Sequence, residues 1–98
     1  MFENAEIVMD GTWVYDGSVT CNLWIVKCHI LYGSGDYKDP PEIRDDKEIE
    51  CYYIEFESMI ERGKVSSVRG AFLTLSDAMN EAEKVTNQKI NWAKRNIN

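Results

Sequence analysis

The chain has 98 residues and a net charge of −6, and this length corresponds to one domain. Hydrophobic residues make up 44% and charged residues 29% of the composition, which excludes a disordered chain. No stretch approaches the roughly 18 apolar residues that a membrane-spanning helix needs. The first ten residues contain no Lys or Arg, unlike a signal peptide, so we expect the protein to work in the cytoplasm.

The acidic residues concentrate in the middle of the chain. Residues 36–61 hold ten Asp or Glu against three Lys or Arg, whereas residues 62–76 hold three basic residues and no acidic one. An acidic surface repels a phosphate backbone, so we do not expect direct binding of nucleic acid. A protein partner with a basic surface fits this charge better.

Two stretches near the N-terminus are predicted strands. The first, at 11–17, ends in Asp16-Gly17, a pair typical of a two-residue hairpin turn because glycine accepts a positive φ angle. The second, at 19–32, is rich in β-branched and aromatic residues and is long for a strand. Residues 23–26 are apolar on both alternating faces, so we expect this strand to be covered on both sides.

Residues 32–46, YGSGDYKDPPEIRDD, are predicted to be a loop after the second strand. The glycines at 33 and 35 do not fit the GxxxxGK[ST] pattern, so the loop does not predict a phosphate site. The carboxylates do not follow the alternation of a calcium loop, so no metal site is predicted. The proline pair should stiffen the loop in an extended polyproline conformation. Two interpretations stay open: a recognition surface for a basic partner, or a solvated connection.

Two further strands are predicted at 47–58 and 65–75, from their β-branched and aromatic residues. Simple alternation along the second of them places Val68 and Phe72 on the same face. Gly70 lies inside this strand and predicts a β-bulge or a close approach of another backbone segment.

A helix is predicted to follow, from 76 to about 87. Ser76 is the expected N-cap, and Asp77 stands in the first turn, where the helix dipole favours an anion. The last residues fit two alternatives. They form either a short final strand containing Ile90 and Trp92, or a continuation of the helix.

Together these elements predict an α+β fold: a small antiparallel sheet of about four strands, in the order β-β-loop-β-β-α, with one C-terminal helix packed on one face. One helix covers only one face of such a sheet. Because several strands are apolar on both faces, the uncovered face predicts an interaction surface, most simply that of a homodimer.

No residue pattern in the chain predicts catalysis, a metal or a cofactor. The cysteines Cys21, Cys28 and Cys51 are odd in number, lie in apolar stretches and form no CxxC pair, so we expect buried reduced thiols. His29 is the one histidine, and no cysteine or second histidine stands at a spacing that would complete a zinc site.

The leading functional hypothesis is a small acidic non-enzymatic interaction protein that binds, and inhibits or adapts, a protein partner with a basic surface. This is the profile of anti-defence inhibitors encoded by phages or mobile elements. The partner's basic surface would be one that normally holds nucleic acid, and the expected contacts lie in the acidic loop: Asp36, Tyr37, Asp39, Glu42, Asp45 and Asp46.

The alternative hypothesis is a protein that binds a small, nucleotide-like ligand. Aromatic residues would stack on this ligand in a pocket at the sheet or at the dimer interface, and basic residues would bind its anionic group. The candidates are Trp13, Trp24, Tyr32, Tyr53, Arg62, Lys64 and Arg69.

Overall fold

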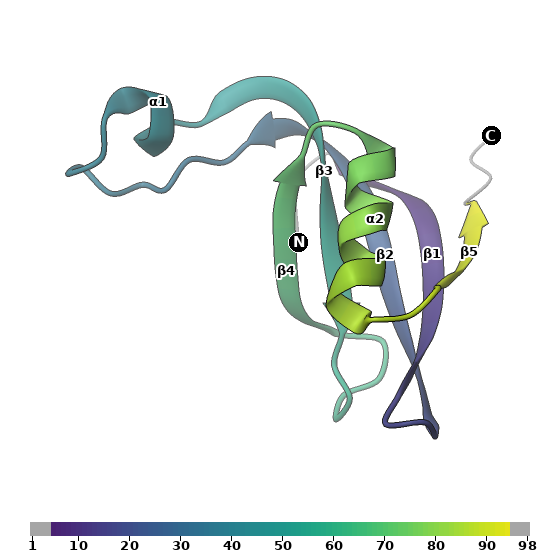
Figure 1. The fold of residues 1–98 in the computed structure, drawn as a ribbon. Coiled ribbons are helices and arrows are strands. Elements are labelled where there is room, and N and C mark those ends of the chain that lie inside the picture. The colour runs from purple at the N-terminus through teal and green to yellow at the C-terminus, as the bar shows by residue number, and fades with distance from the viewer. Residues whose placement is uncertain (1–4, 95–98) are drawn as a thin grey trace.

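A computed structural model describes residues 5–94 (Figure 1). Within this range the chain forms one antiparallel sheet of five strands and two helices, with strand order β4-β3-β2-β1-β5. The α+β class and the antiparallel sheet are as predicted, with one strand and one short helix more than expected. In chain order the elements are β1 (Glu6–Tyr15), β2 (Val19–Leu31), α1 (Pro41–Arg44), β3 (Lys47–Glu57), β4 (Val65–Phe72), α2 (Leu75–Thr86) and β5 (Asn91–Lys94).

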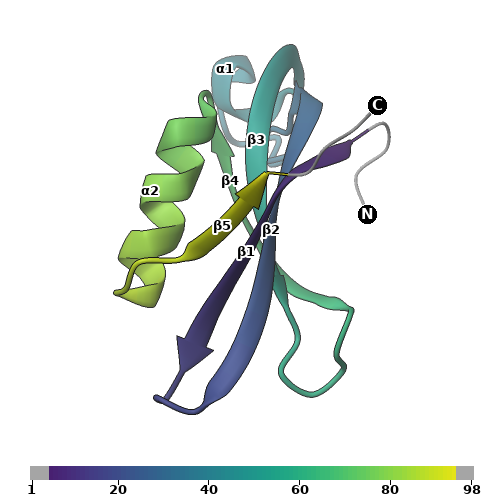
Figure 2. The same ribbon diagram turned by 90° about the vertical axis from the view of Figure 1, so that its right-hand side faces the viewer.

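Helix α2 packs against one face of the sheet and forms the main core there (Figures 1 and 2). Ala78 and Ala82 are fully buried, and their small side chains let the helix lie close to the strands. The helix is preceded by Thr74, whose side-chain oxygen accepts a hydrogen bond from the Asp77 backbone N–H at 3.0 Å. The N-cap is therefore Thr74, and the prediction of Ser76 is wrong by one half-turn. The other buried residues of this core are Met9, Leu23, Ile25, Ile54 and Ile90.

The chain after α2 forms a strand, the first of the two alternatives. Asn87 adopts a left-handed conformation with φ of 55° and ends the helix. Ile90 then enters the core, and β5 pairs with β1. The Trp92 indole N–H donates to Glu83 at 3.2 Å, which attaches the new edge strand to the helix.

The predicted hairpin turn between β1 and β2 is confirmed. Asp16 and Gly17 have φ angles of 52° and 70°, as a two-residue type I′ turn requires, and Ser18 N–H donates to Tyr15 O at 3.1 Å. Strand β1 begins five residues earlier than predicted. Its register shifts between Ile7 and Met9, and such a bulge breaks the alternation by which a strand is recognised.

Gly70 lies at a second irregularity, as predicted. The register between β3 and β4 shifts there, and a Cβ at Gly70 would meet the Tyr53 ring at 2.9 Å. The shift changes the face of the residues that follow. Phe72 packs in the core under α2, whereas Val68 lies opposite Glu55 on the other face. The predicted shared face of Val68 and Phe72 is therefore wrong, because a bulge reverses the alternation.

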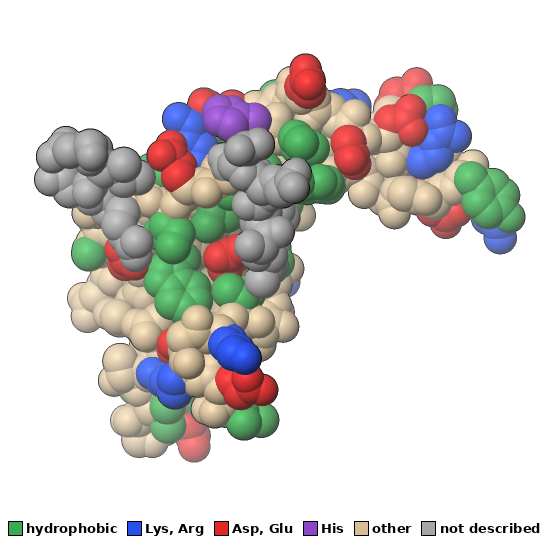
Figure 3. All heavy atoms as spheres, turned by 180° about the vertical axis from the view of Figure 1, so that it is seen from behind, with side chains coloured by type: hydrophobic (Ala, Val, Ile, Leu, Met, Phe, Trp, Pro, Cys, Tyr) green, Lys and Arg blue, Asp and Glu red, His purple; other side chains and the backbone are tan. Residues whose placement is uncertain are grey.

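The face opposite α2 carries a second, smaller core, so β2 is covered on both sides as predicted. Val26, Cys28, Cys51 and Tyr53 are buried there, and Ile7 packs against them from β1. All three cysteines, Cys21 included, are free and buried, as expected from the sequence. Figure 3 views the molecule from this side and shows hydrophobic side chains gathered over the sheet with carboxylates among them.

Two glutamates of β3 are buried on this second face, and only one of them is hydrogen-bonded to described residues. Glu57 is 8% exposed and accepts hydrogen bonds from Gly63 N–H at 2.7 Å and from the Asn22 side chain at 3.1 Å. Burial alone would raise the pKa of Glu57, but these bonds and Arg62 at 3.3 Å outweigh it, and the pKa is lowered. Glu55 is 7% exposed, no described residue donates a hydrogen bond to it, and burial raises its pKa.

The two glutamates should therefore respond oppositely to replacement by glutamine. At pH 7 we expect Glu57→Gln to lower the free energy of unfolding by about 1 kcal/mol or more, because a buried charge-assisted hydrogen-bond network is lost. Glu55→Gln should raise it, because a desolvated carboxylate becomes neutral. Urea unfolding followed by circular dichroism measures both changes.

The pH dependence distinguishes this explanation from simple repacking. Glu57 stabilises the fold above the ordinary glutamate pKa of 4.5, and this contribution is lost as the pH falls through its lowered value. The charge on Glu55 destabilises the fold only as the pH rises above 4.5 towards its raised pKa. Both differences from the wild type should thus shrink as the pH falls below 4.5. Differences that persist unchanged at low pH would contradict the electrostatic origin.

Candidate recognition arm

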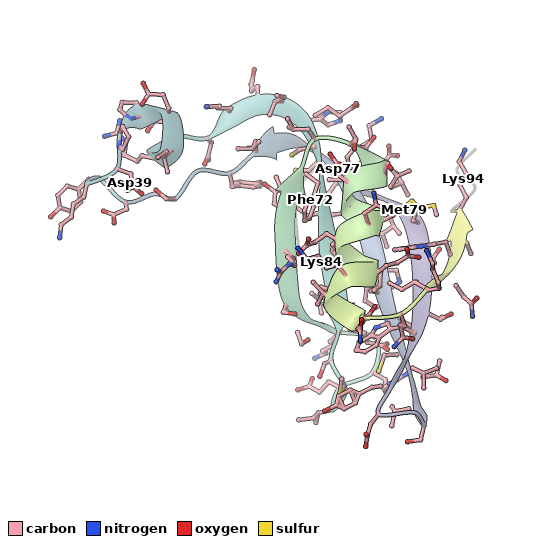
Figure 4. All side chains as sticks on the ribbon, viewed as in Figure 1. Asp39, Phe72, Asp77, Met79, Lys84 and Lys94 are labelled. Atoms are coloured by element: carbon pink, nitrogen blue, oxygen red, sulfur yellow. The ribbon has the colours of Figure 1, made fainter. Side chains whose placement is uncertain are left out.

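Residues 32–46, called the arm below, project from one end of the sheet. Figure 1 shows the chain leaving β2, turning through α1 and returning into β3, well away from α2 and from the other strands. Figure 4 shows the side chains along this narrow extension, with Asp39 labelled among them. The arm is the part of the described chain that reaches furthest from both cores.

Backbone hydrogen bonds close the arm on itself. Ser34 N–H donates to Ile43 O at 2.9 Å, and Gly35 N–H donates to Arg44 O at 3.1 Å, so the outgoing and returning segments are paired. Pro40 has the extended conformation predicted for it, with φ of −63° and ψ of 156°. Pro41 instead begins the single turn of α1, a place where its missing N–H costs nothing.

Most carboxylates of the arm form a hydrogen bond or an ion pair within the arm. Asp36 accepts a hydrogen bond from Lys38 N–H at 3.0 Å, Asp39 from the Ser34 hydroxyl at 2.6 Å, and Asp46 from Gly33 N–H at 2.8 Å. Asp45 forms an ion pair with Arg44 at 2.7 Å, whereas Glu42 is exposed and has no hydrogen bond or ion pair with a described residue. An Asp in a turn often accepts a hydrogen bond from the backbone N–H two residues later, as Asp36 does here. An Asp within a turn-rich loop is therefore the pattern in the sequence that could have indicated this role.

The arm carries two exposed apolar side chains. Tyr37, which the sequence already indicated, is 80% exposed. Ile43, in α1, is 56% exposed and was missed, because an isolated isoleucine in an acidic loop gives no periodic signal. A rigid scaffold that presents large apolar groups to solvent is typical of a binding loop.

The root of the arm is anchored to the second core. Tyr32 N–H donates to the Tyr53 hydroxyl at 3.0 Å, and the Tyr53 hydroxyl lies 3.3 Å from Ile30 O. The two tyrosine rings are 6.2 Å apart. Burial raises the pKa of Tyr53, so the hydroxyl stays protonated and able to donate at neutral pH.

The residues proposed for a small ligand do not meet in one place. Tyr32 and Tyr53 lie at the root of the arm, and Trp24 lies on the sheet face opposite α2, next to Glu55. Arg62 and Lys64 are ion-paired in the turn between β3 and β4, with Glu57 and Glu61 respectively. Trp13 and Arg69 are the two members of the set that line a common cavity.

No metal centre is found in the part of the chain that the structure describes. Among residues 5–94 there is no group of three His, Cys, Asp or Glu side chains that could hold a metal ion. His29 is exposed near the root of the arm. Over the same residues no helix is both long and apolar enough to cross a membrane.

Comparison with known proteins gives no relative. No family model matches the chain, and neither a curated protein nor a solved structure is significantly similar to it.

The closed form of the arm should depend on Gly33. A Cβ at this position would overlap the Arg44 carbonyl and lie 2.7 Å from Asp45 O, and these are backbone atoms that side-chain motion cannot move away. We expect Gly33→Ala to speed hydrogen exchange at the Ser34 and Gly35 amides, measured by NMR. Lys38→Ala, at an exposed arm position without a side-chain contact, is the matched control. Equal exchange rates in the wild type and Gly33→Ala would show that the arm does not need this close approach.

Proposed function

We propose that the protein is a non-enzymatic interaction protein that binds a protein partner through the arm and inhibits or adapts that partner. The observation that carries the proposal is the combination of a hydrogen-bonded, projecting arm with Tyr37 80% exposed at its tip. The proposed partner has a basic surface of the kind that holds nucleic acid. Anti-defence inhibitors of phages and mobile elements are the class that this proposal favours.

The rigidity of the arm supports this role energetically. A loop that is ordered before binding loses less conformational entropy on association than a flexible one. Tyrosine is also among the residues that contribute most at protein interfaces, because it buries a large ring at a small entropic cost. The backbone pairs from Ser34 and Gly35 hold Tyr37 and Ile43 on the same short projection. Both side chains can therefore enter one partner surface together.

The charge of the arm supports a basic partner. Five carboxylates and two basic side chains lie within residues 32–46, and the start of β3 adds Lys47, Glu48 and Glu50, the last paired with Lys27. An excess of carboxylates attracts a basic surface over a distance without contacting it. Glu42 is the acidic side chain best placed for a direct contact, since it is exposed and has no task within the arm.

Two arm variants test the proposal. Tyr37→Ala should weaken partner binding roughly tenfold or more, as expected for an interface tyrosine. Glu42→Lys should slow association and reduce its dependence on salt, because it reverses a charge without breaking the hydrogen bonds of the arm. Wild type and variants are immobilised in parallel, proteins captured from host-cell lysate are identified by mass spectrometry, and the purified partner is then measured at two salt concentrations.

Matched controls stand at the opposite end of the sheet. Ile60→Ala removes an apolar side chain that is 93% exposed, and Glu61→Lys makes the same charge reversal there, with the loss of one exposed ion pair to Lys64. A partner that is lost with the arm variants and kept by both controls supports the proposal. A partner that binds the arm variants and the controls equally well would refute it.

The homodimer stays a prediction. On the face opposite α2, Val14 in β1 and Val68 in β4 are each about two-fifths exposed. Pairing of two such faces would bury these side chains and is the simplest way to cover them. Light scattering of the purified protein should then give twice the mass of one chain at micromolar concentration, whereas the mass of a single chain at all concentrations would exclude the dimer.

A further inference from the structure

A cavity of about 320 Å³ opens beside the C-terminal end of α2, at the end of the sheet furthest from the arm. It lies where β3 turns into β4, a region that Figure 1 shows next to the last turn of α2. Its walls come from three strands, the connecting turn and the helix. The residues that line it are Trp13, Phe56, Glu57, Met59, Ser67, Val68, Arg69, Val85 and Thr86.

The walls of this cavity are mostly apolar, and one cation lies at its edge. Trp13 and Phe56 supply aromatic surface, and Met59 and Val85 supply aliphatic surface. Arg69 donates from Nε to Glu81 at 2.7 Å, which fixes the direction of its side chain. Its two terminal NH₂ groups have no partner among the described residues, so the outer end of the guanidinium can bind a carboxylate through two parallel hydrogen bonds.

Both charged residues that line the cavity have an ion-pair partner, Arg69 with Glu81 and Glu57 with Arg62, and the Glu57 carboxylate lies on the sheet face opposite α2. Glu57 receives hydrogen bonds from Asn22 and Gly63 and an ion pair from Arg62. These donors occupy most of the positions at which the Glu57 oxygens can accept a hydrogen bond. Glu57 therefore has little capacity left to bind a ligand. The Trp13 indole N–H is buried without an acceptor among the described residues. Because this N–H has no accessible surface, the outer end of the Arg69 guanidinium is the donor available to a ligand.

We propose that this cavity binds a small monocarboxylic acid with an aromatic or short aliphatic body. The apolar body would lie against Trp13, Phe56 and Val85, and the carboxylate would pair with the free end of Arg69. The volume is near the lower limit for ligand pockets, so one or two rings fit it better than a nucleotide with several phosphates. This site lies at the opposite end of the sheet from the arm and does not depend on the partner that the arm binds.

Binding of 2-naphthoate to the purified protein tests the proposal by NMR titration. We expect the backbone amides of Ser67, Arg69 and Thr86 and the Trp13 indole N–H to shift with one common dissociation constant. Arg69→Gln should weaken binding about tenfold or more, because a charge-assisted pair is lost. Lys84→Gln removes a cation from the same helix outside the cavity and should leave the affinity unchanged. Naphthalene-2-carboxamide, the uncharged analogue, should bind more weakly and respond little to Arg69→Gln.

A third variant tests the apolar part of the site. Val85→Trp should fill the cavity and abolish binding of both probes, while circular dichroism of each variant checks that the fold is kept. If Val85→Trp does not fold, Arg69→Gln, which removes only an exposed ion pair, still decides the question. Absence of binding at millimolar 2-naphthoate, shifts confined to other residues, or equal weakening by Arg69→Gln and Lys84→Gln would each overturn the proposal.

Discussion

The long pairing of β2 with β3 is the interaction on which the rest of the structure depends. Both strands are apolar on two faces, so their register creates two cores at once. On one side Ile25 lies beside Ile54, under α2; on the other Val26 lies beside Tyr53. Because side chains alternate with a period of two, a slip of one residue would exchange these faces and destroy both cores. The register is therefore strongly specified.

The same pair of strands also determines where the arm lies. The arm is the connection of this hairpin, and its root is attached to the second core through Tyr32 and Tyr53. A rigid hairpin can hold a projecting loop in one direction without any cover from the rest of the protein. The cavity beside Arg69 lies at the other end of the hairpin, where β3 and β4 separate from α2. The fold thus separates two surfaces of different chemistry, one acidic and projecting, the other apolar and recessed.

Much of this fold could be predicted from local signals, because those signals report backbone preferences. Asp16-Gly17 accepts positive φ angles, and the alternating residues 23–26 require cover on both sides, whatever the rest of the chain does. The predicted faces of residues in β4 were wrong because they depend on the pairing of β4 with the neighbouring strand. Gly70 indicated an irregularity in this strand, but the faces of Val68 and Phe72 depend on how β4 pairs with β3 on either side of the shift, and the local pattern does not reveal that pairing.

For the candidate sites too, the sequence determined some features and the tertiary structure determined others. The sequence by itself determined that an acidic, proline-stiffened loop with Tyr37 joins two central strands, and that no metal or nucleophile pattern accompanies it. Only the tertiary structure decided that Asp36, Asp39 and Asp46 form hydrogen bonds within the arm and that Glu42 forms none with a described residue. It also decided that Trp13 and Arg69 share a cavity. The physical reason is that composition fixes charge and backbone preference, whereas hydrogen-bond partners and enclosed volumes depend on residues far apart in the chain.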